Sequence, residues 1–529
     1  MTPIFRSFRT ISYGLLAAVL LSTFSACGPA AADPISVETP AQTTAVSLTP
    51  PPQAINSLFG VPYYDHGAPM NPLTETLQLN RDVCSLLYDT LFTVGTDFRP
   101  EANLCASAAE TDTGFVLTLR EGVLFHDGTR LTANDVVYSL KLAMTNEASV
   151  YRDRFDGVSA IGIDAQNRIV LTVDGKRPSL LAELSIPIIK QGTGIDRDAV
   201  GTGRYCMVET DGQRYLVPNT AHFSGQSVGT QMTHMQLTAV ADADSLIYGV
   251  ASGNIDILRT ADASRSDIVL HADADRYTLE TSVLLYAGFG NHNAIFDHAR
   301  IRTAAANVIR AAFDGSVTAA PMLFHPNLGY VLAEPEPTDT TFTAEVLLAT
   351  AFVQSGYSRD AEGRFVLADG SYLTLRLLYD GTDHESVAAA EKIAASFDTA
   401  GIAMTLSAKS GADFDAAFAK KQFDICLDSF DAGSDFDFTE LLKTGGAAAL
   451  CGVASSDLDL LLASYRQVGT ADGGLIAKQI GERIAVSERI VPIGYRRDEV
   501  LLNRKFRIAG VKMTADDIFY NVYDWVRAK

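Results

Sequence analysis

Residues 115–144, FVLTLREGVLFHDGTRLTANDVVYSLKLAM, constrain the fold most, because their pattern changes twice within a short stretch. Apolar and polar residues alternate at the start, which predicts a strand. HDGT then predicts a turn, since Gly128 tolerates positive φ and Asp127 can accept hydrogen bonds from the amides that follow it. Thr132 with Asp135 three residues later is typical of a capping box. The segment therefore predicts a strand, a turn and a capped helix, whose buried face holds Val136, Leu140, Ala143 and Met144.

His126 and Asp127 lie side by side in this turn and raise the question of a catalytic pair. Catalysis of that kind needs a nucleophile, and no Ser or Cys in a nucleophile context lies near them in the sequence. We therefore interpret both as turn residues.

The same segment resembles the signature of the family 5 extracytoplasmic solute-binding proteins, the oligopeptide, dipeptide and nickel receptors of ABC importers. Members typically carry LR.GV.FHDG.PLTA.DV.YS, and Arg130 stands here where Pro is usual. The residues that fit are Leu119, Arg120, Gly122, Val123, Phe125, His126, Asp127, Gly128, Leu131, Thr132, Ala133, Asp135, Val136, Tyr138 and Ser139. Further segments resemble the family in the expected order, among them AVGTGRYCM (199–207), SLIYGVASGNIDILR (245–259) and FDHARIRTAAANVIRAAF (296–313). The resemblance covers nearly all of residues 54–529.

The resemblance implies an α/β fold of two lobes, periplasmic-binding-protein-like (type II, class C-like), with a ligand cleft between the lobes. The first lobe is expected to take residues 54–290, with residues 486–529 returning to it, and the second lobe residues 291–485. The residues themselves support a mixed α/β chain of several folding units. An apolar stripe at helical spacing precedes Gly401, which is placed to end a helix, and the strand-like IAMTLSA follows; the stripe holds Val387, Ala390, Ile393, Ala394 and Phe397.

The first 26 residues have the pattern of a secretory signal peptide. Arg6 and Arg9 supply positive charge, and the apolar run GLLAAVLL that follows is too short to span a bilayer comfortably. TFSAC resembles a bacterial lipobox, which implies a lipidated Cys27 as the new N-terminus, although Phe24 replaces the usual Leu. The alternative is an ordinary signal peptide cleaved near Ala32.

Residues 27–53 comprise the expected lipidated Cys27 and a stretch rich in Pro, Thr and Ala without hydrophobic periodicity. Such a stretch is expected to be an extended tether. The protein is therefore expected to be extracytoplasmic and anchored to the lipid bilayer of the cell membrane, on its periplasmic side or outer surface, by the acyl chains of Cys27.

The chain is strongly acidic, with a formal net charge of −21. Removing residues 1–26 changes this to −23, because they carry Arg6 and Arg9 and no acid. Such a surface repels phosphate backbones, so nucleic acid is not an expected partner. Among the cysteines, Cys84 with Cys105 is one conceivable disulfide, and Cys426 within the apolar run FDICLDSF is expected to be a buried small side chain.

Other chemistry has weaker support in the sequence. Gly225–Gly229 satisfies G-x-S-x-G, but the hydrolase elbow needs a buried strand before Ser227 and a helix after it, and neither flanking segment has that pattern. The closest histidine pairs lack metal-ligand spacing and are expected to be solvated loop residues, so neither a metal nor a cofactor is expected; they are His222 with His234 and His292 with His298. No Walker A motif appears, so any ATP hydrolysis belongs to separate subunits.

The segment ICLDSFDAGSDFDF (425–438) is the most informative candidate site. An apolar strand ends in several acids spaced by Gly433 and Ser434, at the end of a strand where α/β folds often bind ligands. The segment resembles the peptide-receptor motif W..D..DPD.F, in which an acid contacts the α-amine of the ligand. Phe430 and Phe436 then replace the Trp and the Pro.

By that resemblance Asp431 or Asp435 is the amine partner. A charge-assisted hydrogen bond in a water-excluded cleft makes this assignment physically sensible. The alternative is a solvated acidic loop, with or without Ca²⁺ nearby. The expected ligand contacts are Phe430, Asp431, Asp435, Asp437 and Tyr63.

The function expected from the resemblance is that of a solute-binding lipoprotein of an ABC importer, monomeric and without enzymatic activity. It would bind peptides or a similar small solute by lobe closure and deliver the solute to a permease served by separate ATPase subunits. A simple dipeptide receptor fits less well, because no Arg for a ligand carboxylate is evident near Asp383 and His384. The alternatives are a nickel-type metal-complex or oligosaccharide receptor of the same fold, a surface protein that binds peptides for signalling, and a secreted serine hydrolase.

Overall fold

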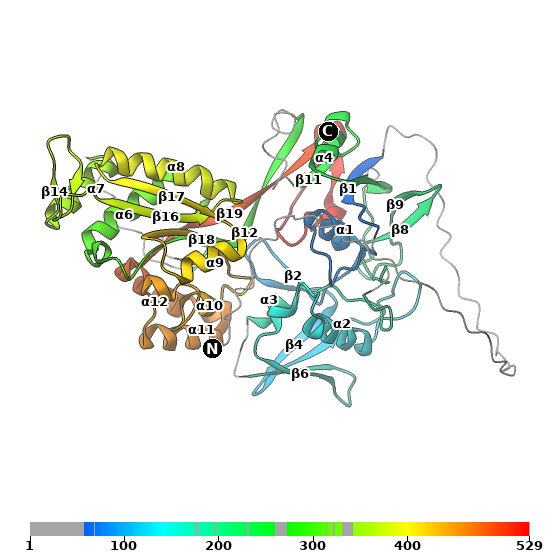
Figure 1. The fold of residues 1–529 in the computed structure, drawn as a ribbon. Helices are drawn as coiled ribbons and strands as arrows, with labels where there is room; N and C mark the ends of the chain where they lie inside the picture. The colour runs from blue at the N-terminus through cyan, green and yellow to red at the C-terminus, as the bar shows by residue number, and fades with distance from the viewer. Residues whose placement is uncertain are drawn as a thin grey trace, which may run out of the picture.

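The computed structural model describes residues 58–527 except 68, 175–176, 178, 196–197, 230–231, 260–271, 314, 321–322 and 331–341. The expected signal peptide, the lipidation site Cys27 and the tether lie outside the described residues. Figure 1 shows the chain folded into two lobes, one built from the early and last elements and the other from the middle ones.

The first lobe contains one mixed sheet and one antiparallel sheet, and short helices pack against both. One sheet has the order β1 (Phe59–Tyr64), β10 (Met235–Val240), β9 (Gln213–Pro218), β8 (Tyr205–Thr210), with β1 parallel to β10. The other has the order β4 (Cys105–Thr111), β5 (Gly114–Leu119), β7 (Ile169–Val173), β6 (Val158–Ile163). The remaining elements of this lobe are α1 (Gln78–Leu87), the hairpin β2 (Phe92–Val94) and β3 (Pro100–Ala102), α2 (Ala133–Thr145), η2 (Arg152–Phe155), α3 (Leu180–Glu183) and α4 (Ala243–Ser252).

The largest sheet runs through both lobes. Its order is β11 (Ile257–Arg259), β19 (Ile490–Asn503), β12 (Ala274–Phe289), β18 (Ile425–Asp431), β16 (Thr374–Asp380), β17 (Ala403–Lys409), with β13 (Thr318–Ala319) also paired to β19. The second lobe adds η4 (Ala294–Asp297), α6 (Ala299–Ala312), η5 (Pro326–Leu328), α7 (Ala344–Gln354), β14 (Ser358–Arg359), β15 (Phe365–Val366), α8 (His384–Thr399), α9 (Gly411–Ala419), α10 (Thr439–Leu442), η6 (Ala449–Cys451), α11 (Ser456–Asp472) and α12 (Gly474–Ser487).

The strands β12 and β19 connect the lobes (Figure 1). They pair antiparallel from Ala274 opposite Asn503 to Gly288 opposite Ile490. The register shifts between Glu280 and Leu284, so the ladder is interrupted where the sheet passes from one lobe to the other. The first-lobe half of this ribbon also pairs with β11, and the second-lobe half pairs with β18.

Alternate residues of the large sheet enter two different cores, because side chains in a strand point to opposite faces. Leu285 and Ala287 of β12 pack with α6 and α8, whereas Leu284 and Tyr286 pack with α9, α11 and α12. Cys426 of β18 lies on the second face and is fully buried, as predicted. A sheet covered on both faces explains the nearly continuous apolar runs of these strands.

The chain after β19 packs into the core of the first lobe. Its elements are η7 (Arg504–Phe506), β20 (Ile508–Ala509), η8 (Val522–Asp524) and β21 (Val526–Arg527). Phe519 and Trp525 are buried in the same cluster as β1 and β5. Arg204 holds this tail, because its guanidinium donates to the carbonyl of Phe519 at 2.7 Å and pairs with Asp517 at 2.5 Å.

The predicted strand, turn and capped helix are confirmed as β5, the turn at His126–Gly128 and α2. Gly128 has φ +80°, and Thr132 and Asp135 form the capping box, with the Thr132 amide donating to the Asp135 carboxylate at 2.8 Å. Val136, Leu140 and Ala143 are buried and Met144 is half-buried. The backbone amide of His126 donates to the carbonyl of Gly201, so this turn is hydrogen-bonded to the glycine-rich segment around Gly201.

The predicted helix end at Gly401 is also confirmed, since that residue has φ +89° between α8 and β17. The conceivable disulfide is wrong, because Cys84 and Cys105 are both free and buried. Cys84 lies on α1 and Cys105 begins β4, and each fills a place in the first-lobe core as a small apolar side chain.

Candidate ligand site between the lobes

A cavity of about 210 Å³ lies between the lobes. The first lobe contributes the β2–β3 hairpin and the tail after β20, the ribbon contributes β12, and the second lobe contributes Asn327 and Ser434. Its lining residues are Val94, Gly95, Thr96, Phe98, Thr278, Glu280, Ser282, Asn327, Ser434, Met513, Thr514, Ala515 and Asp516. The cavity therefore lies where relative motion of the lobes changes its size.

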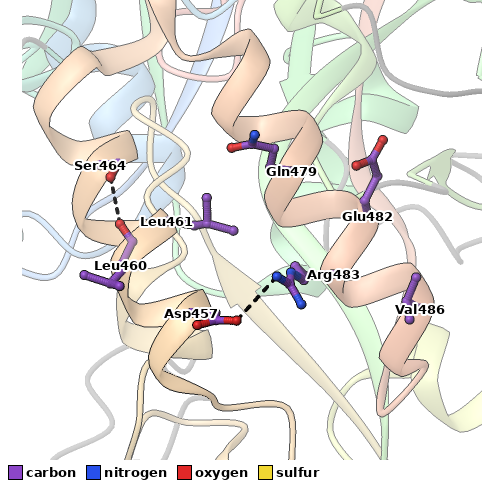
Figure 2. Close-up of a pocket in the computed structure, with 8 residues that line it drawn as sticks. All are labelled: Asp457, Leu460, Leu461, Ser464, Gln479, Glu482, Arg483 and Val486. Carbon is purple, nitrogen blue, oxygen red and sulfur yellow. Dashed lines mark hydrogen bonds and ion pairs between the residues drawn. The ribbon is translucent and has the colours of Figure 1, made fainter.

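A second hollow, of about 600 Å³, lies between α11 and α12. Figure 2 shows its side chains rising from these neighbouring helices, with Asp457 paired to Arg483 across the groove at 3.4 Å. Leu460 and Val486 on its walls are 68% and 83% exposed, so the groove is open. Since its lining residues all come from one lobe, closure of the lobes cannot enclose a ligand there.

The predicted acidic loop, defined here as residues 431–438, borders the interlobe cavity. Asp431 is exposed at the end of β18, and its carboxylate accepts from the Ser282 hydroxyl at 2.6 Å and from the Gly433 amide at 3.0 Å. Ser282 lines the cavity, which brings Asp431 to its edge. Phe430, half-buried, lies with its ring centroid 6.0 Å from that of Phe438.

Asp437 lies further along the loop, two residues before α10 begins. Its carboxylate accepts from the Thr439 amide at 2.9 Å and pairs with Nε of Arg466 at 3.1 Å. Arg466 is on α11, and its Nη2 also pairs with Asp156 of the first lobe at 2.5 Å. This side chain therefore links the acidic loop to the opposite lobe at the surface.

Asp435 differs from its neighbours, because it is buried against the other lobe. Its carboxylate accepts from Nη2 of Arg177 at 2.7 Å, and both side chains are at most 8% exposed. The Ser179 hydroxyl lies 3.4 Å from the same oxygen. Burial raises the pKa of Asp435, and the positive charge of Arg177 offsets part of that rise. The alternative of a solvated acidic loop therefore fits Asp431 and does not fit Asp435.

Glu183, the last residue of α3, contacts the backbone of the same loop. Its Oε1 accepts from the amide of Ser434 at 2.8 Å and from that of Asp435 at 3.2 Å. Oε2 lies 3.5 Å from Nε of Arg154. Burial, followed by the nearby charge of Asp435, raises the pKa of Glu183 from 4.5 to about 7.

An aromatic contact reinforces this meeting of the lobes. Phe98, at the tip of the β2–β3 hairpin, packs edge to face against Phe436 with ring centroids 4.9 Å apart. The ring of His325 lies 4.8 Å from that of Phe98. Nε2 of His325 lies 3.2 Å from the carboxylate of Glu280, which lines the cavity. The cavity is thus closed on one side by a buried aromatic cluster.

Tyr63, the remaining predicted ligand contact, is not brought to this loop. It lies on β1, is buried in the core of the first lobe, and its ring lies 5.6 Å from the guanidinium carbon of Arg214. It is not among the described residues that line the cavity. Its role in ligand binding stays a prediction.

The sequence did not point to Arg177 or Glu183. Arg177 meets Asp435 across 258 positions and Glu183 meets Ser434 across 251, so no local spacing relates them. The sequence shows only that Arg177 and Glu183 are charged residues in a segment without clear hydrophobic periodicity. A charge alone does not identify the residue with which it pairs.

The histidines do not form a metal centre in the described part of the chain, where no group of three or more His, Cys, Asp or Glu side chains could hold an ion. The expectation of solvated loop histidines is wrong for His222, which is buried. Nε2 of His222 lies 3.2 Å from the Asp89 carboxylate and Nδ1 lies 2.8 Å from the Ser224 hydroxyl. Ser227 of the G-x-S-x-G motif lies on the segment between the strands β9 and β10, whereas an elbow needs a sharp turn from a strand into a helix.

None of the helices within the described ranges is long and apolar enough to cross a membrane.

Comparison with known proteins agrees with this architecture. The family profile described as bacterial extracellular solute-binding proteins, family 5 Middle, matches residues 99–448. The structure is similar to a nickel ABC transporter protein of Bacillus halodurans, with a TM-score of 0.73, 16% identity, and coverage of 87% of this chain and 98% of that one. It is also similar to the oligopeptide-binding protein AppA of Bacillus subtilis in complex with a nonapeptide, with a TM-score of 0.61, 16% identity, and coverage of 89% and 99%.

A curated relative, Protein XP55 of Streptomyces lividans, is 27% identical over 198 residues. That match spans 35% of this chain and only 36% of the relative. The solved structures, at such low identity, support the fold, and the family profile covers most of the chain, including the turn motif and the acidic loop. The chain therefore belongs to the bacterial extracellular solute-binding proteins of family 5, which are ABC transport receptors.

Proposed function

We propose that this protein is a lipid-anchored receptor of an ABC importer that closes its lobes over a peptide or similar small solute and delivers the solute to a permease. The observation that carries the proposal is the cavity between the lobes, bordered by the acidic loop. Hinge closure around a ligand is an established type of transition for receptors of this architecture. The permease and the ATPase are separate subunits, and the receptor itself acts as a monomer.

The cavity supports a small ligand. Its volume of about 210 Å³ lies below the range of about 300–1,000 Å³ that is common for drug-sized ligands. The arrangement described here has room for a short solute only, and a longer peptide requires the lobes to separate. AppA of Bacillus subtilis, with its bound nonapeptide, has the same fold.

The proposed lobes are residues 54–290 with 486–529, and residues 291–485. β12 ends at Phe289 and β19 begins at Ile490, near these bounds, but the halves of both strands that pair with β18 or pack with α6 and α8 lie in the second lobe.

Within the acidic loop, we assign the ligand amine to Asp431. Asp431 is exposed and next to Ser282, whereas Asp435 already has Arg177 as its partner. Phe430 and Asp437 remain proposed as neighbouring contacts. Tyr63 also remains a proposed contact, although it lies in the core of the first lobe and not at the cavity.

The experiment is calorimetric titration of the mature chain with short peptides, free or acetylated at the amine. Asp431→Asn is expected to weaken binding of free peptides about tenfold or more, since a hydrogen bond to a charged group contributes about 1.5–3 kcal/mol. Acetylated peptides should bind the parent protein weakly, with no further loss in the variant. Asp398→Asn, an exposed acid on α8, is the matched control.

Equal affinity of Asp431→Asn for free peptides would contradict the assignment of the amine partner. Binding of a nickel chelate or an oligosaccharide in place of every peptide would move the proposal to another receptor class of the same fold. Recovery of cleaved peptide would contradict the receptor function altogether.

The anchor is tested separately. Cys27→Ser is expected to release the protein from the membrane fraction and to abolish incorporation of labelled fatty acid, because stable anchoring needs the acyl chains. Retention of the variant in the membrane fraction would favour another mode of attachment.

A further inference from the structure

The strongest unassigned feature is a buried polar contact between the two lobes. On the first lobe, Arg177 comes just before Ser179 and α3, and Glu183 is the last residue of α3. Figure 1 places α3 on the side of the first lobe that faces α10 and α11. On the second lobe, the partners are the backbone amides of Ser434 and Asp435 and the Asp435 carboxylate. We refer to Arg177, Glu183, Ser434 and Asp435 together as the latch.

We propose that the latch stabilises the closed arrangement of the two lobes, so that Asp435 serves lobe closure and does not select the ligand. This inference rests on the proposed function only in taking lobe closure as the working motion of the receptor. The guanidinium of Arg177 occupies the position on Asp435 that a cationic group of a ligand would otherwise take.

The geometry of the loop is adapted to this contact. Gly433 has φ +63°, and a Cβ at this position would lie 2.9 Å from Oε1 of Glu183. A residue without a side chain is therefore needed both for the backbone conformation and for the approach of Glu183. Phe436 and Phe98, which meet across the lobes, also adopt left-handed conformations, at φ +50° and +60°. Such conformations in residues with side chains persist when surrounding contacts enforce them.

Arg177 is held in place independently of the acid. Its Nη1 donates to the carbonyl of Asp156 at 2.8 Å and lies 3.3 Å from that of Arg154, both on the first lobe. The first lobe alone therefore orients the guanidinium of Arg177, before lobe closure brings Asp435 next to it. Because the pair is buried, loss of one partner leaves an uncompensated charge in the closed form and favours opening.

The latch also makes closure depend on pH. The groups that face Glu183 are Arg154 of η2, Arg177, and Asp431 and Asp435 of the opposite lobe. In the closed form the pKa of Glu183 is about 7, and exposure to water on opening returns it toward 4.5. The closed form therefore binds more protons between these two values, so acidification through this window favours closure and a rise in pH favours opening. Burial raises the pKa of Asp435 in the same direction.

The test is small-angle X-ray scattering of the full mature chain without ligand at pH 5.5 and pH 8.5. The parent protein is expected to be more compact at the lower pH, with the closure constant changing by up to about tenfold per pH unit for one proton. The Arg177→Met variant is expected to be open at both pH values, with an equilibrium constant for lobe closure that is lower by about 100-fold or more. Arg168→Met is the matched control, because Arg168 pairs with Asp164 at 2.7 Å at the surface of a single lobe.

Glu183→Gln separates the latch from general loss of stability. The amide oxygen still accepts from the loop amides, so this variant should close as the parent does at pH 5.5. It should lose the part of the pH dependence that Glu183 supplies and keep only the part that comes from Asp435. Hydrogen exchange at the amides of Ser434 and Asp435 gives a second measure, with protection expected in the parent and lost in Arg177→Met. Equal compactness of Arg177→Met and the parent would overturn the latch, and unchanged pH dependence in Glu183→Gln would overturn the role of Glu183. Since no ligand is present, these results do not depend on whether peptides bind.

Discussion

The strand–turn–helix segment of residues 115–145 and the acidic loop of residues 431–438 are both built from short polar side chains, but they obtain their partners differently. In the first, Thr132 and Asp135 satisfy each other within one turn of helix. In the second, Asp435 finds Arg177 on the opposite lobe. The capping box is therefore formed within one lobe, whereas the contacts of the loop are complete only when the lobes meet. Substitutions in the two regions should affect different equilibria.

The largest expected effect is at the nonpolar part of the lobe contact. Phe98→Ala removes a ring that is 6% exposed, and truncation of a buried Phe costs about 3–5 kcal/mol. Because Phe98 is buried between the lobes, this loss should appear as opening in scattering and as faster exchange at the Ser434 amide. Phe98→Leu retains much of the apolar area, so its scattering profile and its exchange at the Ser434 amide should be intermediate between those of Phe98→Ala and the parent. An unchanged scattering profile would show that the hairpin does not hold the lobes.

Asp135→Ala should show the opposite behaviour. The carboxylate accepts from the Thr132 amide at 2.8 Å and from the Gln191 amide at 2.9 Å, and loss of a helix cap costs about 0.5–2 kcal/mol. The free energy of unfolding in urea should fall by this amount while the scattering profile stays that of the parent. Asp135→Asn, which keeps an acceptor, should lose less. Lobe opening in Asp135→Ala would break the distinction between the two regions.

A pair of glycines gives a closer comparison. Gly128→Ala and Gly433→Ala each place a side chain at positive φ, which costs about 1–2 kcal/mol. A Cβ on Gly128 meets no atom within 4 Å, so this variant should lose only unfolding free energy. A Cβ on Gly433 meets Glu183, so the second variant should also open the lobes. Identical hydrogen exchange in the loop for both variants would contradict the close approach of Glu183.

The smallest effect is expected at Lys190. It pairs with Asp127 of the turn at 2.5 Å, with both side chains about a third exposed, and exposed pairs contribute about 1 kcal/mol or less. Lys190→Met should therefore change the urea midpoint little and leave closure unchanged. A loss comparable to that of Asp135→Ala would mean that the turn depends on this contact more than on its own backbone.

Much of the fold was predictable, because its signals are local. The turn at Gly128, the capping box of Thr132, the helix end at Gly401 and the buried Cys426 each follow from neighbours within a few residues. The family resemblance supplied the two lobes, which periodicity does not determine. The acidic loop was found in the sequence as well, because acids after an apolar strand form a local pattern.

The contacts of that loop were not predictable. Burial of Asp435 and the arrival of Arg177 depend on how one lobe packs on the other, and residues 258 positions apart leave no spacing to detect. His222 illustrates the same limit, since it is buried beside Asp89, which is 133 positions away in the sequence. Tyr63 was expected at the ligand, and the structure places it in a core instead of at the cavity.

The ribbon of β12 and β19 has a mechanical consequence. The chain passes between the lobes as two strands that are hydrogen-bonded to each other, and not as flexible linkers. A change in the angle between the lobes must therefore bend or twist strands that are bonded to each other. The ladder is interrupted at two register shifts, between Glu280 and Leu284 and between Leu285 and Tyr286, so we expect the strands to deform there and the stiffness of the ribbon to set the energetic cost of moving the lobes.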